Sequence, residues 1–241
     1  MLKEILKEQR RYLDERMRTS KVVERERKFD RHTKLVKVIS GVRRCGKSFY
    51  TYLILKNQDF GYANFDDERL LNSEPEEVIK AIFEIYGKIN VIFFDEIQNL
   101  PNWEIFVNRL HREGFDVYLT GSNARLLSSE LATHLTGRHV KLELFPFSFR
   151  EYLKTVNLEG AESERERSLL KKGLEEYIKT GGFPEVLVEK ENPYVYLTEL
   201  FSQIIDRDII VRKRIKYYRT FKELAHTRFY PRFLVRFQFT G

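Results

Sequence analysis

The segment that most constrains the fold is residues 41–48, whose sequence GVRRCGKS fits the pattern G-x-x-x-x-G-K-[ST]. It follows the apolar run 35–39 and precedes a helical pattern that extends to about Lys56. A loop between a strand and a helix can wrap a polyphosphate with backbone N–H groups at the helix start, where the helix dipole also favours anions. The residues expected to line the phosphates are Gly41, Val42, Arg43, Arg44, Cys45, Gly46, Lys47, Ser48 and Phe49.

The side chains of this loop have different expected roles. Lys47 is expected to reach the β- and γ-phosphates, and the Ser48 hydroxyl to ligate Mg²⁺. Arg43 and Arg44 either contact phosphate or are solvated. Cys45 is the single cysteine of the chain, so we interpret it as a small loop residue rather than part of a disulfide or Cys-cluster zinc site.

Two further strand ends carry polar groups. Residues 90–94 form an apolar run that ends in Asp95 and Glu96. Asp95 is expected to hold Mg²⁺ through water, and Glu96 to orient and deprotonate an attacking water. Two acids after a buried strand can also be a solvated strand end, but the upstream phosphate loop favours the chemical roles.

Residues 116–123 read DVYLTGSN and form the next strand end. Here Ser122 or Asn123 is expected to contact the γ-phosphate and the attacking water, with Thr120 as a further candidate. The same residues also fit a turn followed by a helix N-cap, and both interpretations can hold together.

The pattern along the chain predicts an α/β fold. Strands expected at 35–39, 61–67, 90–94, 116–120 and 139–144 alternate with helices, and their near-solid apolar sequences favour a parallel sheet with helices on both faces. We expect four regions: a helical arm at 1–30, a P-loop domain at 31–150, a helical part at 151–226 and an irregular basic-aromatic tail at 227–241.

Composition narrows the class of protein. With 42% apolar and 14% aromatic residues, the chain can form a packed core, which excludes wholesale disorder. No apolar run approaches the roughly 18–20 residues that span a bilayer. The first residues interrupt apolar positions with charges, unlike a signal peptide. These features predict a cytoplasmic protein with no membrane partner.

Taken in order, the motifs resemble one prokaryotic group of extended AAA ATPases. They are the loop at 41–48, FDEIQ at 94–98, LTGS at 119–122 and LTGR at 135–138, and TGGFPE at 180–185 is similar to a signature that follows the nucleotide domain. The resemblance covers about 35–225. It implies an additional-strand P-loop core with sheet order 5-1-4-3-2, and it places Asp66 or Asp67 near the site.

The resemblance also gives Arg138 a role. This residue matches the position where such ATPases place an arginine near the γ-phosphate, in cis or from a neighbouring subunit, which makes a homo-oligomer plausible. A guanidinium there would neutralise charge that develops in the transition state. The alternative is a surface arginine that pairs with a nearby carboxylate.

Positive charge is concentrated at the C-terminal end. The whole chain has a formal net charge of +7, and the segment from Arg207 onward has ten basic residues against two acids. In 207–222, aromatic residues are interleaved with the charges, a composition that favours DNA, although a solvated basic helix face has the same composition. Residues 217–226 look like the first helix of a winged helix. Related chains continue further, so we expect a C-terminally shortened ATPase.

The sequence therefore predicts Mg²⁺-dependent hydrolysis of ATP to ADP and phosphate, coupled to an output through the C-terminal region. No N-K-x-D sequence occurs, which favours ATP over GTP, and residues 24–29 could pack against the adenine. Two alternatives remain open: a slow or non-hydrolysing ATP-controlled switch that docks DNA or a protein, and a P-loop kinase.

Overall fold

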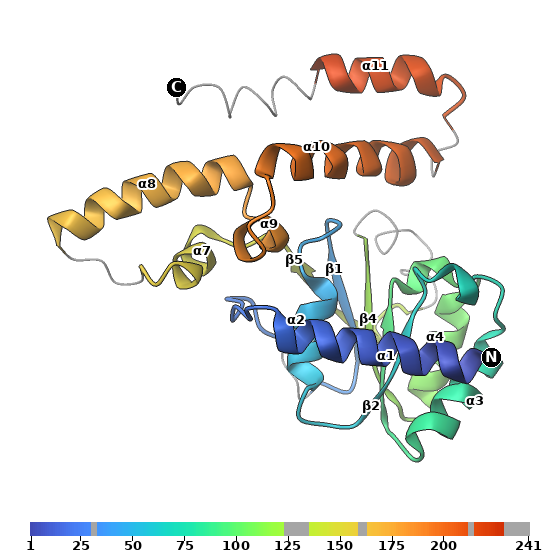
Figure 1. Cartoon of the computed structure of the whole chain (residues 1–241). Coiled ribbons are helices and arrows are strands. Elements are labelled where there is room, and N and C mark those ends of the chain that lie inside the picture. Colours follow the sequence, from blue (N-terminus) through green and yellow to red (C-terminus); the bar gives the residue numbers. More distant parts are fainter. Residues whose placement is uncertain (30–32, 123–134, 159–162, 212–214, 229–241) are drawn as a thin grey trace. The chain divides into compact units, whose positions relative to one another are not determined.

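The computed structural model describes residues 1–29, 33–122, 135–158, 163–211 and 215–228 (Figure 1). The chain divides into two compact units, Met1–Phe145 and Pro146–Gly241. In the sequence, this division falls close to the boundary expected near residue 150. In the described part of the chain, no helix combines the length and apolar composition that crossing a bilayer requires.

The first unit is built around a five-stranded parallel sheet. Its strands are β1 (Val36–Gly41), β2 (Phe60–Asn64), β3 (Val91–Asp95), β4 (Asp116–Ser122) and β5 (His139–Leu144). Their order is β2-β3-β4-β1-β5, and every neighbouring pair is parallel. The predicted α/β fold with strand order 5-1-4-3-2 is thus confirmed.

Helices and apolar cores lie on both faces of this sheet. The helices of the first unit are α1 (Leu2–Thr19), α2 (Lys47–Leu55), α3 (Pro75–Tyr86) and α4 (Trp103–Arg112), with short 3₁₀ turns η1 (Glu68–Leu70) and η2 (Ile97–Asn99). Successive strand side chains point to opposite faces. Accordingly, Phe94 belongs to the core shared with α3 and α4, whereas Phe93 belongs to the core shared with α2.

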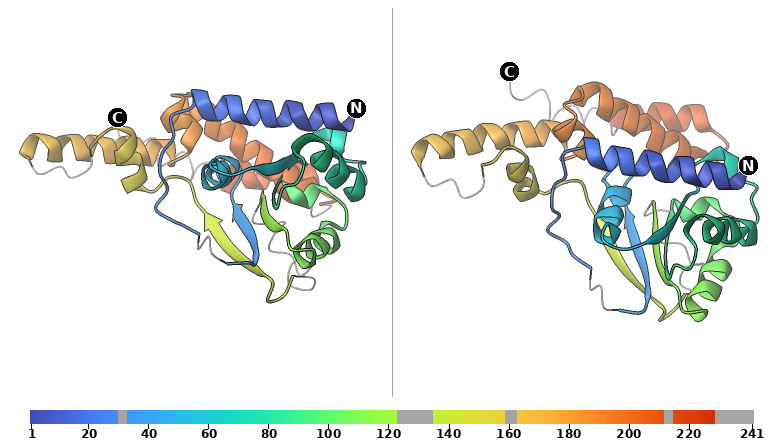
Figure 2. Two further views of the ribbon diagram at one scale, coloured as in Figure 1. Left: turned by 90° about the horizontal axis from the view of Figure 1, so that it is seen from below. Right: turned by 60° about the horizontal axis from the view of Figure 1, so that its bottom comes forward.

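Helix α1 is part of the first unit rather than a separate arm. Its beginning buries Ile5 and Leu6 in one core, and its end buries Leu13 and Met17 in the other. The helix lies beside β2 and α3 (Figures 1 and 2). Strand β2 is at an edge of the sheet, so one side of its main chain pairs with no other strand. Helix α1 covers this side and thereby prevents β2 from pairing with another chain.

Two side chains of α1 satisfy the main chain of this edge. The Gln9 amide donates to the Asn64 carbonyl at 3.1 Å and accepts from the Asn64 N–H at 2.9 Å. Arg10 Nη1 donates to the Phe60 carbonyl at 3.0 Å. Buried backbone groups need such partners, and here a helix supplies what a further strand would otherwise provide.

The second unit is helical where the structure describes it. Its helices are α7 (Phe149–Thr155), α8 (Glu164–Thr180), α9 (Pro184–Val188), α10 (Pro193–Gln203), the π-helical η3 (Ile204–Val211) and α11 (Tyr218–Arg228). Helices α7 and α8 pack through the rings of Phe149, Tyr152 and Tyr177. Ser148 and Glu151 form a capping box that begins α7.

The double glycine of the TGGFPE stretch has a structural role within this unit. Gly181 ends α8 in a left-handed conformation at φ 66°. The Phe147 N–H donates to the Gly182 carbonyl at 2.7 Å, and a Cβ on Gly182 would lie 2.5 Å from the Phe147 carbonyl oxygen. A larger residue at 182 would therefore collide with the chain that enters α7.

Candidate nucleotide site

The candidate site lies at the carboxyl edge of the sheet, where the polar strand ends meet. Because β1, β3 and β4 are parallel neighbours, their ends bring Gly41, Asp95 and Ser122 to the same edge. Open parallel sheets bind ligands at this edge. Residues from three separate sequence motifs thus lie at the same edge of the sheet.

The loop that leaves β1 is closely packed against β5. A Cβ on Gly41 would lie 2.2 Å from the Leu144 carbonyl oxygen and 2.8 Å from Cys45 Sγ, so only glycine fits here. Cys45 is buried, and its thiol donates to the Leu144 carbonyl at 3.3 Å. Burial raises the pKa of this thiol, which keeps it protonated and makes it a packing residue.

The turn into α2 uses two left-handed residues, Arg44 at φ 64° and Gly46 at φ 92°. Lys47 is the first residue of α2 and is buried. Its Nζ lies 3.2 Å from the Val42 carbonyl oxygen and 3.4 Å from that of Gly41. The lysine therefore folds back over its own loop, at the amino end of a helix.

Asp95 is buried at the end of β3 and is surrounded by hydroxyl groups. Thr120 Oγ1 donates to Asp95 Oδ1, the Tyr62 hydroxyl donates to Oδ2 at 3.3 Å, and Ser48 also hydrogen bonds the carboxylate. Burial, followed by the negative charge of Glu96, raises the pKa of Asp95 despite these donors. A buried carboxylate of this kind is stabilised in its charged form when a cation binds.

Glu96 faces the loop lysine. Its Oε1 lies 3.6 Å from Lys47 Nζ, and its Oε2 accepts a 2.6 Å hydrogen bond from Gln98 Nε2. The backbone of Glu96 is left-handed at φ 51°, and its N–H donates to Thr120 Oγ1 at 3.2 Å. Strained backbone of this kind is costly and persists where surrounding contacts hold it, often at functional sites.

The end of β4 contributes fewer described groups than expected. Thr120 is buried and connects Asp95 with the main chain of Glu96, so it positions the acidic pair. Among the described residues, the buried Ser122 Oγ has no hydrogen-bond partner, which leaves it available to a ligand. Asn123 lies outside the described residues.

Other predicted residues lie around the loop. Arg43 Nη1 is 3.9 Å from Asp66 Oδ2, so the end of β2 does come close to the loop. Asp67 instead pairs with Arg69 and accepts from Gln9, and these contacts lower its pKa to about 2. Phe49 packs beside the Arg16 guanidinium, 5.3 Å from its ring centroid.

The structure does not bring Arg138 to this site within one chain. Arg138 precedes β5, where its carbonyl accepts from the Val36 N–H at the amino end of β1. Five residue steps of a strand rise roughly 16 Å, and this length separates Arg138 from the loop edge. Its Nη1 donates to Asn108 Oδ1 at 2.7 Å. This conformation does not support an action in cis, and both actions, in cis and on a neighbouring subunit, stay predictions.

Comparisons with known proteins agree with this geometry. Residues 33–153, half of the chain, match the AAA domain family, and the match includes the loop and the acidic pair. The chain belongs to the AAA domain family. This membership supports nucleotide binding of the ATPase type at the loop edge.

Two relatives extend the similarity beyond the AAA domain. One, from Methanocaldococcus jannaschii, is 40% identical over 217 residues, and another, from Haemophilus influenzae, is 37% identical over 199. Both are named only as uncharacterized proteins. The alignments cover 86% and 76% of this chain but 49% and 48% of those proteins. This AAA domain chain thus spans about half the length of the curated relatives it matches.

The residues of this edge fit Mg²⁺. The Ser48 hydroxyl and the Asp95 carboxylate already contact each other, and together they offer oxygen ligands of the kind that this small, hard cation prefers. Mg²⁺ usually takes few protein ligands and keeps several waters or substrate phosphates. Within the described residues, no group of three or more His, Cys, Asp or Glu side chains is arranged so that it could hold a metal ion.

Three residues make contacts at the site that the sequence did not predict, although one of them, Arg25, lies in the segment 24–29 that was expected near the adenine. Tyr62 and Gln98 hydrogen bond Asp95 and Glu96, and Arg25 donates to the Cys45 carbonyl of the loop at 3.0 Å. Gln98 has a sequence signal, since it follows the acidic pair by two positions. Tyr62 and Arg25 have none, because Tyr62 reaches Asp95 and Arg25 reaches the AAA domain loop from elements that are distant in the sequence.

The C-terminal basic segment is only partly described. Residues 212–214 and 229–241 lie outside the described residues, including most of the expected tail. In the described portion, Lys222 pairs with Asp206 at 2.6 Å, and Tyr217 is largely exposed. Residues 227 and 228, expected in the tail, belong to α11. DNA binding by this segment stays a prediction.

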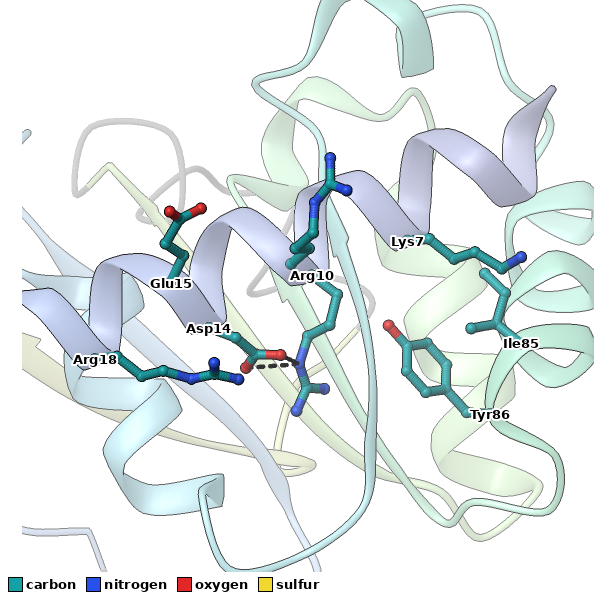
Figure 3. Close-up of a pocket in the computed structure, with 8 residues that line it drawn as sticks. Lys7, Arg10, Asp14, Glu15, Arg18, Ile85 and Tyr86 are labelled. Atoms are coloured by element: carbon teal, nitrogen blue, oxygen red, sulfur yellow. Dashed lines mark hydrogen bonds and ion pairs between the residues drawn. The ribbon is translucent and has the colours of Figure 1, made fainter.

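A separate pocket of about 500 Å³ lies between α1 and the end of α3, apart from the loop edge. Figure 3 shows the Arg10 guanidinium turned toward Asp14, with Tyr86 beside it. Arg10 also stacks on Phe60, 3.9 Å from the ring centroid. The contacts of Arg10 thus join α1 to the edge strand β2, and we assign this pocket no ligand.

Proposed function

We propose that this AAA domain binds Mg²⁺ and ATP at the loop edge and hydrolyses ATP to ADP and phosphate. Lys47 and the loop N–H groups would bind the phosphates, and Ser48 and Asp95 would hold the metal. Glu96 would accept the proton of the attacking water, and Ser122 or Asn123 would contact the γ-phosphate. The output of hydrolysis would pass through the C-terminal unit.

The observation that carries this proposal is the 3.6 Å approach of Lys47 Nζ to Glu96 Oε1. It supports the assignment of Glu96 as the base, because this carboxylate lies beside the group that would bind phosphate. General bases must lie within hydrogen-bond distance of the proton they take, directly or through one water. Glu96 is held on its other oxygen by Gln98, so Oε1 is the atom that faces the loop.

The same contact suggests how substrate would prepare the base. Lys47 pairs with Glu96 and with two loop carbonyls, all at 3.2 Å or more. A polyphosphate carries more negative charge than these partners, so it would draw the ammonium toward itself. Glu96 Oε1 would then be free to accept a proton. Bound Mg²⁺ would supply charge neutralisation on the phosphates.

The test is phosphate release from Mg·ATP by wild type, Glu96→Gln and the control Glu113→Gln, with ATP binding followed in parallel. Glu113 is a half-exposed residue that follows α4 and pairs with Arg109. We expect Glu96→Gln to bind ATP but to lose at least about 100-fold in turnover, since general-base catalysis contributes that much or more. Glu113→Gln should behave like wild type.

Other results would point elsewhere. If wild type binds ATP without releasing phosphate, the ATP-controlled switch replaces hydrolysis as the function. If a labelled phosphoryl group passes to an acceptor, the kinase alternative is correct. If wild type binds no ATP, the whole proposal fails.

A further inference from the structure

The segment that joins α1 to the sheet, residues 20–29, contacts the phosphate loop. Arg25 Nη1 donates to the Cys45 carbonyl at 3.0 Å, and its Nη2 donates to the Phe145 carbonyl at 2.5 Å. Next along the segment, Arg27 Nη1 donates to the Glu143 carbonyl at 3.0 Å. The segment therefore bridges the loop and the end of β5 within the first unit.

Arg25 differs from Arg27 in its burial. Arg25 is only 8% exposed, whereas Arg27 is exposed. Burying a guanidinium is costly unless its N–H groups find partners. Two of those partners are main-chain carbonyls, and one belongs to the phosphate loop itself. An apolar side chain could fill this space without that cost, so the contact with the loop calls for an explanation.

The orientation of one peptide group supplies that explanation. The Cys45 carbonyl and the Gly46 N–H belong to the same peptide unit, and the described chain contains no cis peptide bond. In a trans peptide the C=O and the N–H point in opposite directions. While Arg25 holds the Cys45 carbonyl on its own side, the Gly46 N–H must point away from Arg25. In a loop that binds phosphate with its N–H groups, this orientation matters directly.

We propose that Arg25 is a positioning residue of the nucleotide site, which fixes the 45–46 peptide so that the Gly46 N–H is presented to the phosphates. Gly46 makes this peptide unusually free to rotate, because glycine adopts positive φ without a steric cost. Arg25 removes that freedom before the ligand arrives. Preorganisation of this kind raises affinity because less ordering remains to be done on binding. This inference rests on the proposed phosphate-binding function of the loop.

The electrostatics of the loop agree with this geometry. After burial, which raises the pKa of the Cys45 thiol, the positive charges of Lys47 and then Arg25 act on that thiol in the opposite direction. Arg25 thus adds positive potential beside the loop as well as a fixed hydrogen bond. Both effects favour an anion at the loop and do not depend on the adenine.

The experiment measures dissociation constants of Mg·ATP, Mg·ADP and tripolyphosphate for wild type, Arg25→Met, Arg25→Lys and the control Arg27→Met. Tripolyphosphate has no base, so it separates an effect on the loop from a contact between residues 24–29 and adenine. We expect Arg25→Met to weaken ATP and tripolyphosphate by the same factor, about tenfold. Arg25→Lys should lie between, because one ammonium cannot bridge both carbonyls as a guanidinium does. Arg27→Met should bind tripolyphosphate within about twofold of wild type.

Three results would overturn this inference. The first is a folded Arg25→Met that binds tripolyphosphate as wild type does. The second is a loss confined to ATP and ADP, which would assign Arg25 to the base. If Arg25→Met does not fold, the third is a folded Arg25→Lys with wild-type affinity for tripolyphosphate. In each case wild type still binds ATP, so the proposed function survives; a wild type that binds neither probe would overturn both.

Discussion

Two buried lysines of the first unit, Lys37 and Lys47, show how a structural charge differs from one that awaits a ligand. Lys37 lies on β1 near its amino end and is 1% exposed, and Lys47 follows the carboxyl end of the same strand and is 5% exposed. Lys37 Nζ has two contacts of 2.5 Å, to Asp116 Oδ1 and to the Thr33 carbonyl. The contacts of Lys47 Nζ with other described residues are longer, from 3.2 to 3.6 Å.

The two lysines are similarly buried, but they differ in how closely their ammonium groups are hydrogen-bonded. A buried ammonium needs close partners to offset the loss of water. Lys37 has them, so its charge stabilises the amino edge of the sheet. Lys47 has long contacts at the amino end of a helix, where cations are disfavoured and anions are favoured. An anion bound at the loop would satisfy Lys47, whereas Lys37 needs nothing more.

Replacing each lysine by methionine should therefore produce opposite results, and these are the largest effects we expect. Lys47→Met should weaken Mg·ATP binding at least about 100-fold, since it removes charge-assisted contacts to phosphate, while changing the free energy of unfolding little. Lys37→Met should lower the free energy of unfolding by about 3 kcal/mol, the lower end for a broken buried pair because Asp116 is partly exposed. Titration calorimetry and urea unfolding measure the two quantities.

The crossed design contains its own control, because each variant is the reference for the other. The Lys37→Met protein, at a temperature where it stays folded, should bind ATP with the wild-type constant. The comparison fails if Lys47→Met unfolds the protein as readily as Lys37→Met does, because Lys47 would then be a structural charge as well.

A second prediction, of intermediate size, concerns Asp95 and pH. Burial raises the pKa of Asp95 above its ordinary value of 3.8, so the folded protein binds a proton more tightly than the unfolded chain. Ionised Asp95 therefore costs stability, and this cost develops as pH rises from 3.8 through the folded pKa. We expect Asp95→Asn to raise the melting temperature of the ligand-free protein by a few degrees at pH 7.

The pH dependence separates this explanation from a general packing effect. The advantage of Asp95→Asn should shrink as pH falls and vanish well below 3.8, where wild-type Asp95 is protonated in both the folded and the unfolded state. Mg²⁺ should stabilise wild type but not the variant in the presence of ADP. A stabilisation that does not change with pH would contradict the electrostatic origin.

How much the sequence could predict depends on whether a feature is encoded locally or arises only when distant segments come together. The meeting of the loop and the acidic pair at one edge was predictable, because each follows a local pattern and parallel strands end at the same edge. The strand order came instead from the resemblance to extended AAA ATPases. Arg25 was not, because its partner carbonyls at Cys45 and Phe145 become neighbours only after β1 and β5 pair. A single arginine in a charged connector carries no local signal of burial.

Residue roles were less predictable than residue positions. Thr120 could not be distinguished from Ser122 as a sensor by sequence, yet its hydrogen bonds to Asp95 and to the Glu96 N–H show a positioning role. Short motifs show which residues gather at the edge. The choice among neighbouring hydroxyls depends on strand register and side-chain direction, which the local pattern does not encode.

Replacing Arg138 should have the smallest effect of these substitutions on the stability and ATP binding of the isolated chain. It tests whether the amino edge of the sheet has a role in turnover. Its Asn108 contact is exposed, so Arg138→Ala should change the free energy of unfolding by no more than about 0.5 kcal/mol and leave the ATP dissociation constant unchanged. Within one chain, the guanidinium lies at the wrong end of β5 to act on its own loop. We therefore propose that any contribution of Arg138 to turnover comes from an assembly. We expect the specific ATPase activity of wild type to rise with protein concentration and that of Arg138→Ala to lose this rise. If wild type and Arg138→Ala have equal specific activities that do not change with protein concentration, Arg138 has no role in turnover. Its contact with Asn108 would then be structural, like the Lys37 contacts at the same edge.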